Sequence, residues 1–165
     1  MTLRIAKVFL VAAVAFFYTL VVFNNTTDYG SNYQLVHHVL LMDSTFPGNH
    51  GMWRAIPSPA IQTIFYWVII GWEAVTMLLT WIGAARLARA LRRPASEFNS
   101  AKRVPIAALM LGMLLWLVAF ICVGGEWFLM WQSKTWNGQE AAFRMFAVSG
   151  IVFFILALPD TEAQA

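Results

Sequence analysis

The residue with the strongest case for chemistry is Glu73, a carboxylic acid in the middle of an apolar stretch over residues 61–83. At 100° per residue, the other polar side chains of this stretch fall with Glu73 inside an arc of about 80°. The members of this polar stripe are Gln62, Tyr66, Glu73, Thr76 and Thr80. Polar groups that face lipid are costly, so the stripe should point into a bundle of helices.

The expected depth of Glu73 limits what its side chain can do. If the hydrocarbon begins near Ile61, Glu73 lies about 18 Å inside a core that is about 30 Å thick. A charge at mid-span costs about 2.5–3.5 kcal/mol on insertion scales, and no basic side chain lies at comparable depth in the other apolar stretches. Two roles fit Glu73: a proton or cation site, or a protonated carboxyl that donates a hydrogen bond to a neighbouring helix. Unless water or a partner subunit reaches it, we expect a neutral carboxyl at pH 7. Its expected hydrogen-bond partners are Tyr18, Thr19, Ser149, a backbone carbonyl, Tyr66 and Thr76.

A second group of polar side chains lies in or beside the loops on one side of the expected membrane. This outer-face cluster consists of Asp28, Asn32, His38, Asp43, Glu126, Asn137, Gln139 and Arg144. Glu126 and Arg144 stand at similar distances before and after Trp136, near the centre of a short turn between two apolar stretches. In a hairpin they would reach similar depth, so we predict a salt bridge between them, shared with Asn137 or Gln139. The alternative is that both side chains extend separately to the headgroup layer.

Histidines raise the question of a metal or haem site. His37 and His38 are adjacent, and adjacent residues on a helix point about 100° apart, so they do not readily bind one ion together. No histidine lies inside an apolar stretch, which argues against a haem held by two histidines within the membrane. We expect no metal and no cofactor. The alternative is a metal site built from one of these histidines with His50, Asp28 and Asp43.

Composition indicates a membrane protein. The chain of 165 residues is 60% hydrophobic and 12% charged, whereas a soluble domain is about 45–50% apolar and about 25% charged. The apolar residues gather in four runs, over about 5–23, 61–83, 106–131 and 141–158. We predict one all-α membrane domain over residues 1–165, with four transmembrane helices in an antiparallel bundle. The single cysteine, Cys122, allows no disulfide within the chain, and no nucleic-acid motif is present.

Two long loops connect the predicted spans. The outer loop, residues 24–60, contains a short interfacial helix that we expect over residues 33–42. We predict that this helix covers the ends of the spans as a lid, with part of its polar face near Glu126 and Trp127. The other loop, residues 84–105, is basic, and the tail over 160–165 is expected to be polar and loose.

The basic residues predict the orientation in the membrane. Of the 11 Lys and Arg residues, most lie beside the N-terminus or in the 84–105 loop: Arg4, Lys7, Arg86, Arg89, Arg92, Arg93, Lys102 and Arg103. The other side holds Arg54, Lys134 and Arg144. The positive-inside rule therefore places both termini in the cytoplasm and the 24–60 loop outside.

Several strings of residues resemble a known family. These strings are Asn25-Thr26-Thr27-Asp28-Tyr29 with Asn32, His38-Val39-Leu40-Leu41-Met42-Asp43, Gly124-Gly125-Glu126-Trp127-Phe128, and Trp136-Asn137-Gly138-Gln139. They resemble a bacterial family of predicted small integral membrane proteins, a domain of unknown function, and the likeness extends over nearly the whole chain. The resemblance implies four spans in a bacterial inner membrane. It implies no activity, no ligand and no functional residue.

Three functions fit these observations. The first is a non-enzymatic accessory or structural subunit of a membrane assembly, because the chain is small and has no nucleotide or cofactor motif. The second is a proton- or solute-coupled channel or carrier, built as a homo-oligomer around the polar stripe. The third is an enzyme that acts on a lipid or quinone in the outer leaflet through Glu126, Asp28 or His38, although no nucleophile and base stand at a recognisable spacing. The expected partners are the lipid bilayer and either other membrane subunits or further copies of the chain, with no nucleic acid.

Overall fold

The computed structural model describes residues 1–161, and within this range the chain is helical and forms no strand. The elements are α1 (Thr2–Thr27), α2 (Tyr29–Leu41), η1 (Met52–Arg54), α3 (Pro59–Ala90), α4 (Ala95–Ala101), α5 (Arg103–Leu114), η2 (Leu115–Trp127), η3 (Met130–Gln132) and α6 (Gln139–Ala157). Four segments are long and apolar enough to cross a membrane: Thr2–Thr27, Pro59–Ala90, Ala95–Trp127 and Gln139–Ala157. The predicted all-α membrane fold with four spans is confirmed.

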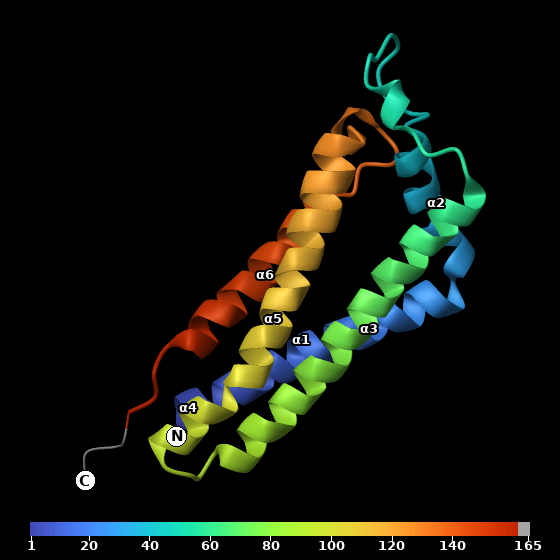
Figure 1. Cartoon of the computed structure of the whole chain (residues 1–165). Helices are drawn as coiled ribbons and strands as arrows, with labels where there is room; N and C mark the ends of the chain where they lie inside the picture. Colours follow the sequence, from blue (N-terminus) through green and yellow to red (C-terminus); the bar gives the residue numbers. More distant parts are fainter. Residues whose placement is uncertain (162–165) are drawn as a thin grey trace.

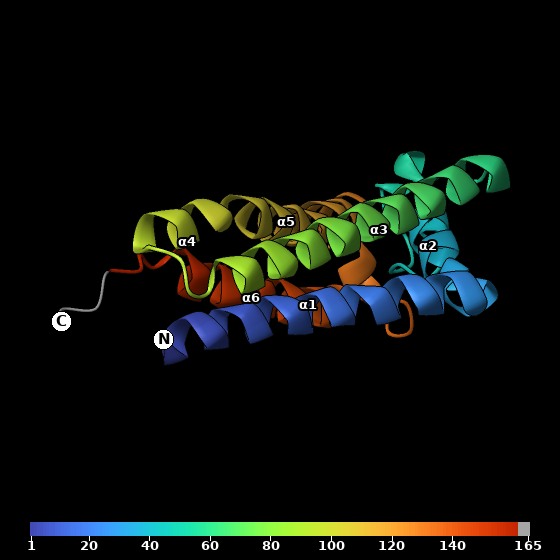
Figure 2. The ribbon, with the colours of Figure 1, turned by 90° about the horizontal axis from the view of Figure 1, so that it is seen from below.

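The spanning helices form an elongated bundle (Figures 1 and 2). We refer to its two ends as the α2 end and the α4 end, after the short helix that lies at each, and the N-terminus lies at the α4 end. The end of α1 lies beside the start of α3, where the Tyr66 hydroxyl donates to the backbone oxygen of Asn25. Nearer the α4 end, the Trp81 indole of α3 donates to the Thr19 hydroxyl of α1.

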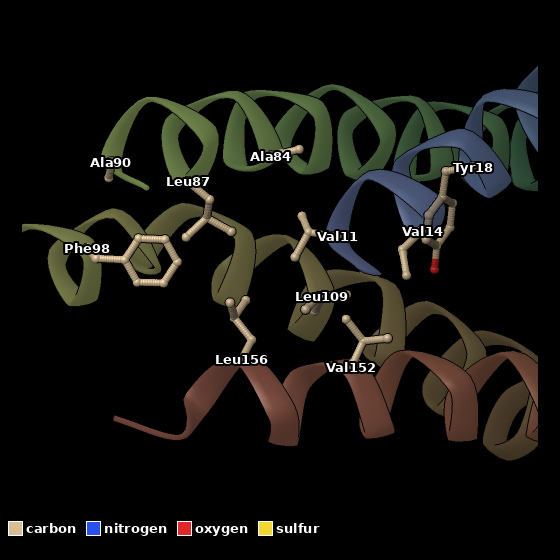
Figure 3. Packing of buried hydrophobic residues seen from close by; sticks show 10 residues of the cluster. All are labelled: Val11, Val14, Tyr18, Ala84, Leu87, Ala90, Phe98, Leu109, Val152 and Leu156. Carbon is tan, nitrogen blue, oxygen red and sulfur yellow. The ribbon is translucent and has the colours of Figure 1, made fainter. Parts of the chain in front are cut away.

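The main hydrophobic core lies toward the α4 end (Figure 3). Its buried residues are Val11, Val14, Tyr18, Ala84, Leu87, Ala90, Phe98, Leu109, Val152 and Leu156. All four spanning segments contribute to it, and Phe98 of α4 closes it from the end. Lipid tails are as apolar as these side chains, so close packing is what holds the helices together here.

Glycines bring the helices into close contact in this half of the bundle. A Cβ atom placed on Gly83 of α3 would lie 2.6 Å from the Cβ atom of Pro105 in α5. A Cβ atom on Gly112 of α5 would overlap the Tyr18 hydroxyl of α1. Small residues allow such close approach of helix backbones in membranes. From the Gly83 contact, α3 and the helix formed by α5 and η2 draw apart toward the α2 end (Figure 1).

The loop predicted over 24–60 is partly helical. α1 continues to Thr27, and α2 begins after a single break at Asp28, so the lid helix starts earlier than predicted. The hydroxyls of Thr26 and Thr27 both donate to the carbonyl of Phe23 in the preceding turn. The polar residues that favour a loop here therefore satisfy carbonyls at the end of a helix instead.

The basic loop predicted over 84–105 is also mostly helical. α3 reaches Ala90, and α4 begins directly after Pro94. The Ala, Leu and Arg residues at the end of α3 are strong helix formers, which continue the span beyond its apolar part. The 84–105 segment is thus a helical hairpin with a short turn.

The third span is not the continuous α-helix predicted over 106–131. The chain is α-helical only to Leu114, and η2 is a π-helix, whose hydrogen bonds join residues five apart. At its end, the Phe128 amide donates to the Val123 carbonyl at 3.0 Å, and Leu129 takes a left-handed conformation with a φ of 56°. Because π-helices are rare and lack a sequence signature, α-helical spacing misplaces the faces of this segment.

The start of the tail is held in place, contrary to the prediction of a loose tail over 160–165. The Oδ2 atom of Asp160 accepts from Lys7 at 2.7 Å and from Lys102 at 2.5 Å, and Oδ1 lies 3.6 Å from Arg4 Nε. The side chains of Asp160 and of both lysines are at most 6% exposed. The prediction treated Asp160 as a solvated residue, whereas the fold brings cations from α1 and from the α4–α5 junction to the end of α6. Residues 162–165 of the predicted tail lie outside the described residues.

Candidate ligand-binding site

The polar stripe of α3 lies inside the bundle. Its exposed fractions are 0% for Gln62, Thr76 and Thr80 and 2% for Tyr66 and Glu73. On the opposite side of α3, the apolar residues Ile64, Val68 and Leu78 are more than half exposed. The spacing of polar and apolar residues on α3 thus separates a face toward the other helices from a face toward lipid.

Glu73 is bound by an asparagine of α1. The Nδ2 atom of Asn25 donates to Glu73 Oε2 at 2.6 Å. The Tyr66 hydroxyl lies 3.3 Å from both the backbone oxygen and Oδ1 of Asn25, to either of which it can donate. Within residues 1–161, Glu73 forms no hydrogen bond with any of the acceptors expected for it, and the Tyr18 hydroxyl accepts from the Trp116 indole instead. The reason is the length of α1, whose last turns place Asn25 level with Glu73.

Glu73 lines a cavity of about 200 Å³ at the α2 end. The polar groups on its wall belong to Asn25, Asn32, Tyr66 and Glu73, and the rings of Trp116 and Phe120 form part of the apolar wall. No serine, cysteine, histidine, lysine or arginine is among the described residues that line it. Within residues 1–161, the Glu73 Oε1 atom has no hydrogen-bond partner, so one carboxyl oxygen is available to a ligand.

Toward the α4 end, packed side chains follow directly below Glu73. The Thr76 hydroxyl donates to the Trp72 carbonyl of its own helix, and Thr80 donates in the same way to the Thr76 carbonyl. Tyr18 is fully buried and fills the space against Gly112 and Thr76. Toward the α4 end, the polar stripe is therefore a packed contact between helices.

The lid helix α2 is fixed to the beginning of α3 by Gln62. The Oε1 atom of Gln62 lies 2.7 Å from His37 Nδ1 and accepts from the Tyr33 hydroxyl at 3.3 Å. The Nε2 atom of Gln62 donates to the Ile56 carbonyl, and the Ile56 amide donates to the Leu40 carbonyl at 2.8 Å. One buried amide thus joins α2, the loop after it and α3.

The other side of α2 contacts the turn between η2 and α6. The His38 ring stacks on Trp136 with 4.4 Å between ring centroids, and His38 Nδ1 lies 2.7 Å from a carboxyl oxygen of Asp43. Leu40 packs with Phe128 in a small buried cluster. The predicted lid is present, but its polar residues contact Gln62, Asp43 and Trp136, and no polar contact joins the described part of α2 to Glu126.

The predicted salt bridge between Glu126 and Arg144 is wrong. Neither residue belongs to the ion pairs of the described chain, and both side chains are exposed. Gly125 faces α6, because a Cβ atom there would overlap the side chain of Gln139. Glu126 is the next residue on the helix, so its side chain leaves the helix in a different direction from the Gly125 contact with Gln139.

The rest of the outer-face cluster is divided between different surroundings. Asn32 lines the Glu73 cavity and lies 3.4 Å from the Asp28 carbonyl. Asn137 accepts from the Gln139 amide at the start of α6. Sequence reasoning grouped these residues by the side of the membrane on which they lie, which does not determine their contacts.

No metal site forms among the described residues, in which no three His, Cys, Asp or Glu side chains stand together. Of the residues of the alternative metal site, the structure brings His38 and Asp43 together, whereas His37 contacts Gln62 instead.

Sequence reasoning missed Asn25, the residue that binds Glu73. The sequence pattern that identifies Asn25 is a second stripe of polar residues, on α1. Lys7, Tyr18 and Asn25 fall within about 20° of one another at 100° per residue. Each of the three is a polar contact point in the structure: Lys7 with Asp160, Tyr18 with Trp116, and Asn25 with Glu73. The stripe is visible only when the helix is continued to Thr27, beyond the predicted end of the span.

Comparison with known proteins gives a family but no activity. The family described as "Predicted small integral membrane protein (DUF2165)" matches residues 3–159, and its function is unknown. No curated protein and no solved structure matches the chain. Since the match covers nearly the whole chain and the helices fit its description, the chain belongs to this family of predicted small integral membrane proteins.

Proposed function

We propose that this chain is a non-enzymatic accessory subunit of a membrane assembly and that it binds the polar head group of a membrane ligand in the Glu73 cavity. The supporting observation is a buried carboxyl that lines a cavity of about 200 Å³ and has one oxygen atom without a hydrogen-bond partner among residues 1–161. A buried polar group is normally satisfied, so an uncommitted oxygen at a cavity wall is a place for a donor from a ligand.

The groups around the cavity favour binding over catalysis. Its polar wall offers a carboxyl, two amides and a phenol, which can orient a ligand by hydrogen bonds. The residues on which the enzyme alternative depends are not brought together: Glu126 is exposed, and His38 contacts Asp43 on the lid. Within residues 1–161, neither side chain is hydrogen-bonded to a nucleophile.

The structure gives less support to a channel or carrier built around the stripe. A homo-oligomer could line a path with these residues only if they faced the outside of the bundle, but Gln62, Glu73 and Thr80 are at most 2% exposed. Below Glu73, the path through a single chain is filled by Tyr18 and Thr76. A cavity that is closed on one side fits a binding site better than a pathway.

We place the α2 end outside the cell and the α4 end in the cytoplasm of a bacterium, with the chain in the inner membrane. The basis is the gathering of Lys and Arg residues at the α4 end. A fusion of alkaline phosphatase after Ala165 should then be inactive, and a fusion of green fluorescent protein should be fluorescent. The reverse result would contradict this orientation.

The binding proposal is tested by native mass spectrometry of the chain purified in mild detergent. We expect the wild-type protein to retain a bound molecule that is lost in Glu73→Leu. Glu126→Gln is the matched control, since it changes an exposed carboxyl near the same end and should retain the molecule. A melting curve shows whether each variant is folded. Equal retention by folded Glu73→Leu would contradict a head-group site at Glu73.

The accessory role is tested by purification from the native membrane. Other subunits in fixed stoichiometry are expected with the wild-type chain and with Glu73→Gln, which keeps the shape of the side chain. A homo-oligomer without other subunits would favour the channel instead.

A further inference from the structure

An apolar groove of about 270 Å³ lies beside the Glu73 cavity, between α3 and η2 and under α2. Its rims are open to the surface, since Phe65 and Val68 of α3 are 40% and 59% exposed and Val118 of η2 is 42% exposed. Its inner wall includes Leu115, which is fully buried. The groove thus opens sideways, on the part of the bundle surface that faces lipid.

The groove exists because α3 and η2 separate toward the α2 end. The Trp72 indole donates to the Leu111 carbonyl at 3.0 Å and holds α3 to α5 where the groove ends. Beyond this bond, Ala119 and Gly124 of η2 leave space opposite α3, and both line the groove. The π-helical segment therefore forms one wall of the groove.

The groove and the Glu73 cavity are neighbours that share four wall residues. These are Leu35, Val36, Ile69 and Phe120. One space is apolar and the other has a carboxyl on its wall, so together they match a molecule with a hydrocarbon chain and a polar head. Their combined size falls within the range of about 300–1,000 Å³ that ligand sites occupy.

The charges around the two spaces select the kind of head group. Glu73 contributes an acidic group, and no lysine, arginine or histidine is among the described residues that line either space. The rings of Tyr66, Trp116 and Phe120 surround the cavity. Aromatic rings and a carboxyl together attract an organic cation that can also donate hydrogen bonds.

We propose that the site binds a lipid with a primary ammonium head group, whose ammonium contacts Glu73 and whose hydrocarbon chain lies in the groove between α3 and η2. This inference rests on the proposed binding role of the Glu73 cavity and adds the class of ligand. The lipid reaches the site sideways from the leaflet at the α2 end, between the rims formed by Val68 and Val118.

The test uses octadecylamine that carries a diazirine at mid-chain, added to the purified full-length chain in detergent and activated by light. The labelled residues are mapped by mass spectrometry. We expect labels on the groove residues of η2 and α2, and several-fold less label from the carboxylic acid of the same chain length. Glu73→Gln should remove the preference for the amine while leaving the chain in the groove.

Filling the groove should block the probe. Ala119→Leu places a larger side chain in the groove and should lower labelling there several-fold, whereas Ala13→Leu makes the same change on an exposed face of α1 and should have no effect. Val68→Phe narrows the open rim of the groove without placing a side chain in the core. This variant replaces Ala119→Leu in the labelling test if Ala119→Leu has a lower melting temperature than the wild-type protein. Equal labelling of all lipid-facing segments, unchanged by both groove variants, would overturn the inference. If Glu73→Leu still loses its co-purified molecule in that case, the proposed head-group site stands without the groove.

Discussion

Replacing Asp160 with Asn removes the negative charge that Arg4, Lys7 and Lys102 share at the α4 end. Loss of one partner from a buried ion pair costs about 3–5 kcal/mol, because the remaining charge is left without compensation. Here both lysines also donate to the Leu158 carbonyl, at 2.8 and 2.6 Å, and would keep these bonds. We therefore expect Asp160→Asn to lower the free energy of unfolding by about 3 kcal/mol, the lower end of that range.

The same cluster predicts a dependence on pH. Burial alone would raise the pKa of Asp160, but hydrogen bonds from Lys102 and Lys7 outweigh burial and hold the pKa below its ordinary value of 3.8. A carboxyl with a lowered pKa in the folded state stabilises the protein above its ordinary pKa, and this contribution is lost as the pH falls through the folded pKa. The wild-type protein should thus lose stability below about pH 4, and Asp160→Asn should lack this part of the loss.

The measurement is unfolding in detergent micelles, followed by circular dichroism at neutral and acidic pH. The control is Asp43→Asn, which removes a carboxyl that is 40% exposed and lies 2.7 Å from His38 Nδ1. An exposed pair contributes about 0–1 kcal/mol, so the control should change stability little. If Asp160→Asn is no more destabilising than Asp43→Asn at neutral pH, the cluster does not hold the end of α6 to α1, and the reasoning is refuted.

Two further substitutions test the packing. Gly83→Ala should destabilise the bundle by about 1–3 kcal/mol, because its Cβ atom would lie 2.9 Å from the Cα atom of Pro105. Gly71→Ala should be nearly neutral in the same unfolding assay, because among the described residues its new Cβ atom meets no atom of another helix within 4 Å. Trp136→Ala removes the ring on which His38 stacks, so it should speed amide hydrogen exchange across α2 but not across α6. Unchanged exchange in α2 would show that the position of the lid does not depend on this contact.

The sequence predicts the buried face of α3 correctly because helical geometry is the same in a membrane as in water. A polar stripe at helical spacing has to be buried where lipid surrounds the helix, so Gln62 and Glu73 were placed in the interior without knowledge of their partners. The same rule applied to α1 would have found Asn25. It failed there only because polar residues near the end of an apolar run were assigned to a loop.

Other features depend on contacts that no local pattern encodes. The partners of Asp160 come from α1 and from the α4–α5 junction, so they meet only after the whole bundle has formed. The direction of Glu126 depends on the π-helical course of η2, whose residues resemble those of any apolar span. Depth along a hairpin can be counted from the sequence, but the direction of each side chain around the helix cannot be counted once the α-helical repeat is lost.

The contact between Asn25 and Glu73 also bears on the charge of the site. The amide of Asn25 is a neutral donor, so it orients the carboxyl at 2.6 Å but cannot serve as its counter-ion. Within residues 1–161, no cationic side chain lines the cavity or the groove beside it. A positive charge next to this carboxyl would therefore have to come from outside the described chain. The groove, which opens toward lipid, adjoins the Glu73 cavity. Asn25→Leu removes the group that orients the carboxyl but keeps the carboxyl itself. It should weaken the binding of octadecylamine, which should still bind more tightly than the carboxylic acid of equal chain length. Glu73→Gln should remove this preference for the amine. If Asn25→Leu removes the preference as Glu73→Gln does, the carboxyl is not the group that selects the amine.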